Sequence, residues 1–274
     1  MHDAAFRQIQ DLERDHWWFR GRRRVYTSIL EAHLGHARPL RVLDVGCGAG
    51  GFIESLATLA DEVHAVDVEP AILGRASERS LTSCTRGAAE ALPYRDGSFD
   101  VVCLFDVIEH VDDDRAALRE AFRVVRPGGL VVASVPAYPW LYANNDRVAG
   151  HRRRYTRGSL RLLAARSRLR IERLTHTNVV LLPLIAPAVL ALRALESLHL
   201  FGSGSQHTNL SLPLPRFAHR VLEHAFTAEL ALSSRFDLPF GHSIVMIARR
   251  PQTSFGVRAR RVRSKLAGRL RRAA

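Results

Sequence analysis

The sequence has little cysteine. Cys47, Cys84 and Cys103 are the three in 274 residues, and no two of them form a CxxC pair. An odd number of thiols without this spacing excludes a disulfide framework and argues against a structural zinc site. It favours a reducing compartment.

Long apolar runs are also missing. The N-terminal segment MHDAAFRQIQDLERDHWW carries acidic residues where a secretory signal needs an apolar stretch. The longest apolar run, 179–192, has 14 residues and includes two prolines, whereas a spanning helix needs about 20 apolar residues. We therefore expect a cytoplasmic protein without a transmembrane helix.

Acidic residues are absent from one part of the chain, the C-terminal stretch 249–274, which holds ten Lys and Arg residues. The whole chain has 40 basic and 27 acidic residues, a net charge of +13, so most of the excess lies in this stretch. Apolar residues make up 47% and charged residues 24%, as in soluble globular proteins that bury a sizeable core. These patterns predict one domain over 1–250 and a basic tail over 251–274.

Short β-branched runs alternate with amphipathic stretches from residue 40 onward, and Thr156 has the properties of a helix N-cap. Strands and helices in alternation require right-handed crossovers and a mostly parallel sheet. We expect an α/β fold with a doubly wound, Rossmann-like, seven-stranded sheet, an N-terminal helical cap over 1–39, and a helical insertion over 176–240 before the last strand. The expected strands are 40–45, 63–67, 83–86, 101–105, 129–135, 170–174 and 243–248, and the early helices are 51–60, 71–79 and 115–125.

The first chemical signal is the glycine-rich segment VLDVGCGAGG over 42–51. Glycines after a buried strand allow a tight turn and let backbone N–H groups approach a ligand closely. Gly46, Gly48 and Gly51 fit the GxGxxG pattern of dinucleotide sites, whereas Gly46, Gly48 and Gly50 fit the GxGxG pattern of another nucleotide-like cofactor. Asp67, 21 residues after Gly46, can accept both ribose hydroxyls of either one. The loop alone leaves the cofactor open.

Three further segments follow in order: EALPYRDGSFDVV over 90–102, DVIEHV over 106–111, and 118–129, which ends in RVVRPGG. Together with the glycine segment they resemble class I S-adenosylmethionine-dependent methyltransferases over about 40–136. The likeness is greatest to the type 11 branch that includes ubiquinone-biosynthesis O-methyltransferases. The segments HWWF over 16–19 and GHRRRY over 150–155 resemble an uncharacterised bacterial subgroup of this family that is associated with lipid or surface-glycan pathways.

This resemblance implies S-adenosylmethionine as the cofactor. The sequence departs from the family at one position. Ala88 stands where the family commonly has an Asp that binds the adenine amino group. The methionine part would lie along the glycine segment, the ribose on Asp67, and the adenine near Val68, Ala89 and Glu90, with Arg23 or a neighbour near the cofactor carboxylate. The implied cofactor-binding residues are Asp44, Gly46, Cys47, Gly48, Gly50, Asp67, Val68, Ala89, Glu90, Phe105, Asp106 and Arg23.

Methyl transfer to oxygen or carbon also needs a base, and histidine titrates near neutral pH. His110 follows a strand at the edge where ligands bind in doubly wound folds, and in similar enzymes a histidine here is the base. Its alternative role is to pack on the next helix. His151 is the second candidate, in the region that holds the acceptor pocket in the family. The substrate residues expected there are Tyr138, Trp140, Asp146, Arg154 and Tyr155, and the alternative is a solvated basic turn.

The main prediction contains no metal, but Asp106, Glu109 and His110 form the acid-x-x-Glu-His pattern of relatives that require a divalent ion. Mg²⁺ is therefore an alternative cofactor, and a solvated acidic helix start over 112–114 is the competing explanation. We expect a methyltransferase for a small-molecule, glycan or lipid-linked acceptor, acting at oxygen. The alternative is a methyltransferase-fold binding protein or an RNA methyltransferase that uses the basic tail. The core has no recognisable RNA-binding module, which disfavours nucleic acid.

The apolar run 179–192 is expected to pack against a helix over 217–230. The alternative is a partly exposed apolar face beside the acceptor pocket, which would accept a prenyl or acyl chain and rest on a membrane. The basic tail would add attraction to anionic lipid. The protein would then be peripheral to the membrane.

Overall fold

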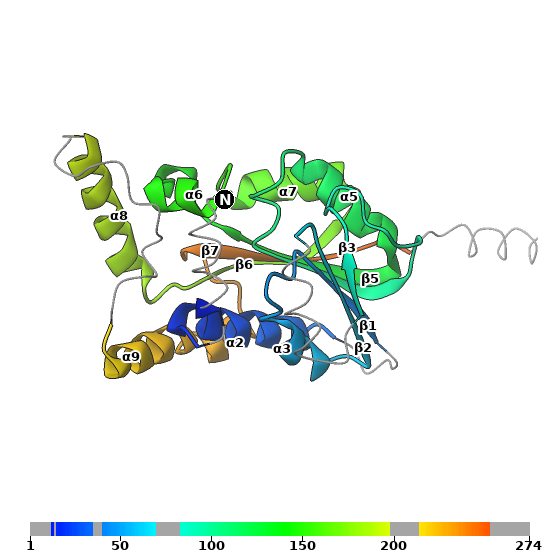
Figure 1. The fold of residues 1–274 in the computed structure, drawn as a ribbon, viewed down its shortest axis with the longest axis horizontal. Coiled ribbons are helices and arrows are strands. Elements are labelled where there is room, and N and C mark those ends of the chain that lie inside the picture. Colours follow the sequence, from blue (N-terminus) through cyan, green and yellow to red (C-terminus); the bar gives the residue numbers. More distant parts are fainter. Residues whose placement is uncertain (1–11, 14, 35–39, 70–82, 198–213, 253–274) are drawn as a thin grey trace, which may run out of the picture.

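The computed structural model describes residues 12–13, 15–34, 40–69, 83–197 and 214–252 (Figure 1). Seven strands form one sheet in the order β3-β2-β1-β4-β5-β7-β6. β7 pairs antiparallel with β5 and β6, and the other neighbouring strands pair in parallel. The strands are β1 Arg41–Val45, β2 Glu62–Asp67, β3 Ser83–Arg86, β4 Phe99–Phe105, β5 Val125–Pro136, β6 Arg170–Thr177 and β7 Ser243–Arg249. The predicted α/β sheet is confirmed.

Helices cover both faces of the sheet, with α5 and α7 above it and α2, α3 and α9 below it in the view of Figure 1. Helices are needed on both faces because the residues of the central strands are apolar on both sides of the sheet. In β4, Val102 and Leu104 belong to the core beside α5 and α7, whereas Val101 and Cys103 belong to the core beside α2 and α3. The helices are α2 Trp17–Glu31, α3 Ile53–Ala57, α5 Asp114–Val124, η1 Pro139–Leu141, α6 Asn144–Ala149, α7 Arg157–Arg166, α8 Leu182–Ser197, α9 Arg216–Thr227 and α10 Leu230–Ser233.

Helix α2 forms the described part of the predicted N-terminal cap. His16 is its N-cap and accepts a hydrogen bond from the backbone N–H of Trp18. The helix crosses α9 at Gly21, where an added Cβ would lie 2.5 Å from the Phe226 ring. The absence of a side chain at Gly21 therefore lets α2 and α9 pack closely, which fixes α2 under the sheet.

The insertion between β6 and β7 differs from the prediction in one respect. Leu181 is buried and Ile185 is partly buried against the core, but Leu184 is 66% exposed and residues 190–194 are exposed. The expectation that the run packs against the helix over 217–230 is therefore wrong. Phe217 and Val221 of α9 are exposed, whereas Phe226 occupies the interface with α2.

None of the helices in the described ranges is both long enough and apolar enough to cross a membrane. The expected helix over 71–79 and residues 253–274 of the basic tail lie outside the described residues. The domain division at residue 250 therefore remains a prediction. Thr156 does cap α7, since its hydroxyl accepts a hydrogen bond from the Ser159 backbone N–H at 3.1 Å.

Candidate functional site

The glycine loop lies at the carboxyl edge of the sheet, between β1 and α3. Gly46, Gly48 and Gly50 all have positive φ, which favours glycine over other residues. At Gly46 an added Cβ would also lie 2.7 Å from a Val107 methyl group. The Gly48 N–H donates to Oδ2 of Asp67 at 3.1 Å, so the structure brings the predicted loop and the predicted ribose ligand together.

Three carboxylates surround this loop. Asp44 is 2% exposed, and its Oδ2 has no hydrogen-bond partner among the described residues. Burial, with Glu13 and Asp67 nearby, raises the pKa of Asp44 well above its usual range. Glu13, which the sequence did not single out, accepts hydrogen bonds from the backbone N–H groups of Ala49 and Gly51 at 3.1 and 3.2 Å. The loop N–H groups thus bond to Asp67 and Glu13, and the unpartnered Asp44 Oδ2 is an acceptor that suits a cationic group such as the amine of S-adenosylmethionine.

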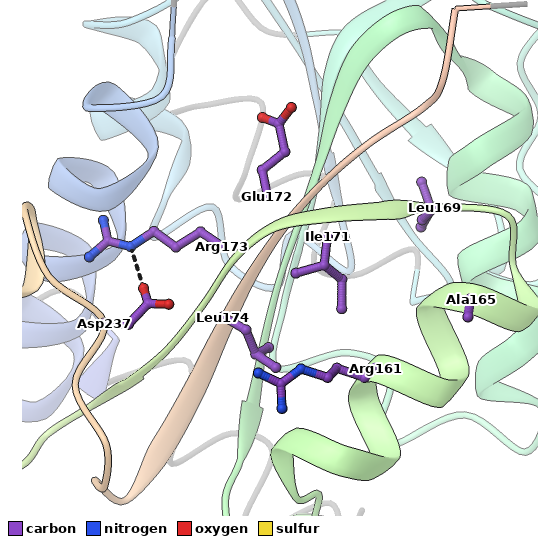
Figure 2. A pocket seen from close by; sticks show the side chains of 8 residues that line it. All are labelled: Arg161, Ala165, Leu169, Ile171, Glu172, Arg173, Leu174 and Asp237. Carbon is purple, nitrogen blue, oxygen red and sulfur yellow. Dashed lines mark hydrogen bonds and ion pairs between the residues drawn. The ribbon is translucent and has the colours of Figure 1, made fainter.

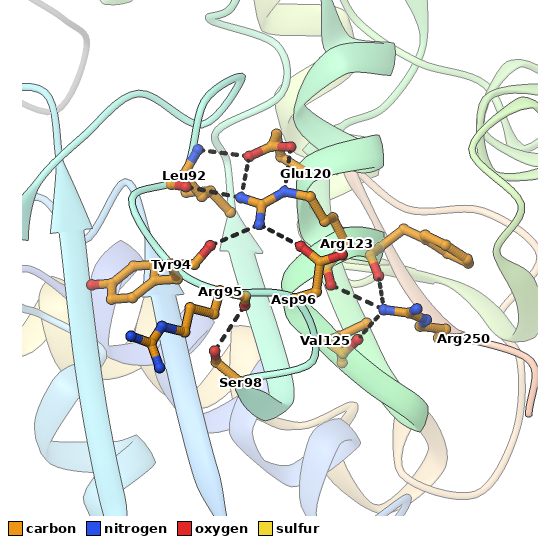
Figure 3. Close-up of polar contacts among 10 residues, drawn as sticks. Leu92, Tyr94, Arg95, Asp96, Ser98, Glu120, Arg123, Val125 and Arg250 are labelled. Carbon is orange, nitrogen blue, oxygen red and sulfur yellow. Dashed lines mark hydrogen bonds and ion pairs between the residues drawn. The ribbon is translucent and has the colours of Figure 1, made fainter.

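The segment after β3 would lie beside the adenine. Val68 is 58% exposed at the end of β2, whereas Ala89 is buried and Glu90 is partly buried. Arg123 on α5 holds this segment, donating to the carbonyls of Leu92 and Tyr94 at 2.9 and 2.7 Å (Figure 3). Ala89 and Glu90, two of the residues predicted near the adenine, thus lie on a loop that α5 fixes through Arg123, whereas Val68 lies after β2.

Around that arginine, Glu120 completes the network in Figure 3. It accepts hydrogen bonds from Arg123 at 2.8 and 2.7 Å and from the backbone N–H of Leu92 at 2.8 Å. The hydrogen bond from Arg123 is the main cause that lowers the pKa of Glu120 below its usual range. Arg250 donates to three carbonyls at the end of α5 and the start of β5. These contacts fix the C-terminal end of the helix that carries Arg123.

Asp106 begins the turn after β4 and has a positive φ of 54°. The Ser134 hydroxyl donates to Asp106 Oδ1 at 2.8 Å, and Arg22 forms an ion pair with Oδ2. Arg23, the residue predicted near the cofactor carboxylate, instead donates to the Glu13 carbonyl. The arginine of α2 that reaches the turn is therefore Arg22. The preceding Phe105 side chain stacks on Phe52, with ring centroids 4.3 Å apart, and its predicted contact with the cofactor remains a prediction.

His110 and His151 meet although 41 residues separate them in the sequence. Their ring centroids lie 4.8 Å apart. Burial, followed by the proximity of His151, lowers the pKa of His110 to about 3. His110 Nδ1 lies 3.2 Å from the Gly150 carbonyl, and His151 Nδ1 lies 2.8 Å from Asp146 Oδ1. In each ring the Nδ1–H donates to an oxygen, which leaves Nε2 as the acceptor.

Asp146 is completely buried and accepts three hydrogen bonds, from His151 and Arg154 on Oδ1 and from the Ala143 backbone N–H on Oδ2, each at 2.8 Å. Burial by itself would raise its pKa, but the His151 hydrogen bond and the Arg154 charge outweigh burial and lower the pKa of Asp146 to about 2. A carboxylate that stays ionised in this place orients the imidazole of His151.

The three arginines of the GHRRRY segment form ion pairs with acidic residues of the protein itself. Arg152 and Arg153 form ion pairs with Asp112 and Asp114 at 2.5 and 3.2 Å, and Arg154 binds Asp146. Arg154, which was predicted as a substrate residue, is only 9% exposed. Its role is to hold the buried Asp146 in place. The acidic run 112–114 pairs with this segment, while Asp113 caps α5.

The aromatic residues predicted for the acceptor take different positions. Tyr138 stacks on His176 with ring centroids 5.6 Å apart and lies beside Trp140, which is 50% exposed. Tyr155 is buried, and its hydroxyl donates to the Ile108 carbonyl and contacts Asp114 Oδ2 at 3.0 and 2.9 Å. Tyr155 thus supports the turn after β4 from within the core, unlike Trp140, which is exposed.

The structure brings together a different set of possible metal ligands from the set that the sequence predicted. Among the described residues, Glu109, His110 and His151 place one ligand atom each within 4.8 Å of one another, and Asp106 is not in that group. Both Glu109 oxygens are buried without a hydrogen-bond partner in the described chain, and burial raises the pKa of Glu109 to about 8. Two imidazoles and one carboxylate suit Zn²⁺ or a similar ion, whereas Mg²⁺ prefers oxygen ligands. The structure therefore gives the magnesium alternative no support.

A separate cavity of about 440 Å³ lies between α7 and the edge strand β6 (Figure 2). Arg161, Leu169, Ile171 and Leu174 are among its lining residues, and the Arg173–Asp237 ion pair at 3.0 Å closes one side. None of the predicted site residues lines this cavity, so it is not part of the candidate active site.

Comparison with known proteins agrees with the motifs. A family model described as a methyltransferase domain matches residues 43–133. The "Probable S-adenosylmethionine-dependent methyltransferase" of Mycolicibacterium smegmatis is 36% identical over 131 residues, which cover 47% of this chain and 49% of that protein. The ubiquinone biosynthesis O-methyltransferase of Xanthomonas oryzae is 36% identical over 100 residues, 34% of this chain and 42% of that protein. This chain thus spans about half the length of the curated relatives it matches.

Solved structures agree with the fold. The YcgJ protein from Bacillus subtilis superposes with a TM-score of 0.54 at 18% identity, over 82% of this chain and 98% of that one. At this identity the likeness shows the fold alone. The ordered motifs and the seven-stranded sheet agree with the matched model: residues 43–133 form a methyltransferase domain, and this part of the chain is similar to S-adenosylmethionine-dependent methyltransferases.

Proposed function

We propose that this protein methylates a hydroxyl oxygen of a small-molecule, glycan or lipid-linked acceptor, with His151 as the general base. The observation that carries this proposal is the hydrogen bond from His151 Nδ1 to the buried Asp146 carboxylate at 2.8 Å. An imidazole held in this way presents Nε2 as a proton acceptor. The histidine stands in the segment after β5, where the resemblance to the family implies the acceptor pocket.

In the proposed mechanism S-adenosylmethionine supplies, when bound, a methyl group on a positively charged sulfur. The glycine loop and Asp67 would hold the donor, and Tyr138 and Trp140 would contact the acceptor. His151 would take the proton of the acceptor hydroxyl and become an imidazolium, so that the oxygen could accept the methyl group. Asp146 stabilises the resulting imidazolium, because its carboxylate stays charged. Alignment of donor and acceptor accounts for much of the acceleration in such displacements.

His110 is a weaker candidate for the base, because its Nδ1 bonds to the Gly150 carbonyl and no carboxylate orients it as Asp146 orients His151. Burial holds its pKa at about 3, far below the neutral range in which a general base works best. Its hydrogen bond to the Gly150 carbonyl instead fixes the backbone next to His151. We assign His110 the role of positioning His151.

Binding tests the cofactor. In calorimetry with S-adenosylmethionine, its demethylated product and NAD, the first two should bind and NAD should not. Tight NAD binding without a response to S-adenosylmethionine would refute the cofactor assignment.

Activity tests the chemistry. Methyl-labelled S-adenosylmethionine is incubated with separate polar and lipid extracts, and labelled products are separated and counted. His151→Ala should lower the rate of labelling by about 10²–10⁴-fold with cofactor affinity near wild type, whereas His110→Ala should lower it less. Loss of labelling in EDTA that added Zn²⁺ restores would instead assign His151 as a metal ligand. Cofactor binding without any labelled product would favour the alternative of a methyltransferase-fold binding protein.

A further inference from the structure

Helix α8 is apolar around its whole circumference over 182–192, which reads LPLIAPAVLAL and contains no polar side chain. The body of the protein covers little of it. Leu184 is 66%, Leu190 46% and Leu192 44% exposed. A helix that is apolar all round is normally enclosed by protein or lipid. This helix therefore requires apolar surroundings that the described part of the chain does not supply.

Helix α9 adds to the same end of the molecule, as Figure 1 shows at the left of the view. Phe217 is 70% and Val221 61% exposed, and their spacing of four residues places them on one face of the helix. Arg220 and His224 are exposed on this helix as well. Apolar side chains flanked by basic ones are typical of helices that lie in a membrane interface. We call this set of residues the apolar end: Val180, Leu184, Leu190, Leu192, Phe217 and Val221.

We propose that the apolar end inserts into the headgroup region of an anionic lipid bilayer. A protein partner or a second copy of the chain would bury one face of α8, whereas lipid surrounds an inserted helix on several sides. The helix has 16 residues and contains Pro187, so it suits insertion into one leaflet and not a complete span. Exposed Arg193 on α8 and Arg220 on α9 supply positive charge beside the apolar end, which complements negative lipid.

The apolar end lies next to the candidate site. β6 ends at the sheet edge where β5 ends, since Thr177 and Pro136 both pair with Ser243 of β7. α8 follows β6, and Arg193 of α8 donates to the Trp140 carbonyl in η1. Docking would bring Trp140 toward the lipid and favour an acceptor that is held in the membrane. This consequence for the acceptor rests on the proposed function, but the docking itself does not.

Sedimentation with vesicles tests the proposal. Full-length protein is mixed with sucrose-loaded vesicles of phosphatidylcholine alone, or of phosphatidylcholine with 30% phosphatidylglycerol, at low and at physiological salt. Two double variants alter the apolar end, Leu184→Asp with Leu190→Asp on α8 and Phe217→Asp with Val221→Asp on α9. Leu162→Asp is the matched control, because Leu162 is 52% exposed on α7, which lies away from both α8 and α9 in Figure 1.

The wild type and the Leu162 variant should bind anionic vesicles, with binding that weakens as salt rises. Each double variant should bind about tenfold or more weakly, with unchanged thermal midpoint and S-adenosylmethionine affinity. Wild-type protein that stays in the supernatant at low salt, or double variants that sediment like wild type, would overturn the proposal. Dimeric wild type with monomeric double variants in light scattering would assign the apolar end to self-association and would also overturn it.

Discussion

Replacement of Asp146 by Asn removes the charge that orients His151 while it keeps the size of the side chain. The pKa of Asp146 is about 2 against an ordinary value of 3.8. At 1.36 kcal/mol per pKa unit this difference is worth about 2 kcal/mol of folding stability at neutral pH. Because the pKa is lowered in the folded state, this stability is complete above the unfolded pKa and is lost as the pH falls through the folded pKa.

Asp146→Asn should therefore lower the free energy of unfolding by about 2 kcal/mol at pH 7 and the thermal midpoint by about 4–8 °C. The difference from wild type should shrink to about half at pH 3. The variant should also lose methyl transfer by about 10²–10⁴-fold, because the His151 tautomer is no longer fixed. Thermal unfolding from pH 7 to pH 3 and labelled-methyl assays measure the two effects.

Asp112→Asn is the matched control. Asp112 is also paired with an arginine, but its side chain is 81% exposed and that of Arg152 is 51% exposed. An exposed pair of this kind contributes little, so the control should change the unfolding free energy by less than about 0.5 kcal/mol. Equal losses for both variants, or a loss for Asp146→Asn that does not depend on pH, would refute the account of Asp146.

Two further predictions concern Asp67, at the predicted ribose position, and Arg123, which holds the loop over 88–98. Asp67→Ala should weaken S-adenosylmethionine binding in calorimetry by about 10–150-fold, because a charged hydrogen-bond acceptor contributes about 1.5–3 kcal/mol; unchanged affinity would remove Asp67 from the ribose site. Arg123→Leu should break the contacts to Leu92 and Tyr94 and leave Glu120 without its main partner. We therefore expect the free energy of unfolding to fall by about 2 kcal/mol and the loop over 88–98 to be proteolysed faster. Protection of this loop equal to wild type would contradict that role.

The strand pattern and the glycine motif were sufficient to predict the fold, because both are local. Apolar runs of β-branched residues must be buried on both faces, which requires a parallel sheet. Gly46 follows β1 directly, and its positive φ and its contact with Val107 explain why glycine stands there. The prediction failed for α8, because hydropathy alone does not tell whether an apolar helix is covered by its own chain or by something else.

The candidate site was predictable only in part, because its contacts join distant segments. The sequence named both His110 and His151 as bases, but it did not reveal that Asp146 binds His151 in particular. It also assigned Arg154 to the substrate, although the structure uses Arg154 to hold Asp146. Glu13 carries no signal in a single sequence, because its role depends on how the N-terminal segment folds back on the glycine loop.

Arg22 was identifiable from the helix period and leads to the last prediction. In α2 the buried positions include Arg22, Val25, Tyr26 and Ile29, so Arg22 lies on the apolar face and the neighbouring Arg23 does not. Arg22→Gln removes the ion pair of Asp106, whose carboxylate is 22% exposed. We expect about 3 kcal/mol lower stability in urea unfolding and weaker S-adenosylmethionine binding in calorimetry, since the turn after β4 loses its link to α2. Arg23→Gln is the matched comparison and should lower stability and S-adenosylmethionine binding less, because Arg23 donates to the Glu13 carbonyl and not to the turn after β4. An equal or larger loss for Arg23→Gln would mean that Arg23, as the sequence first indicated, is the arginine that matters for the site.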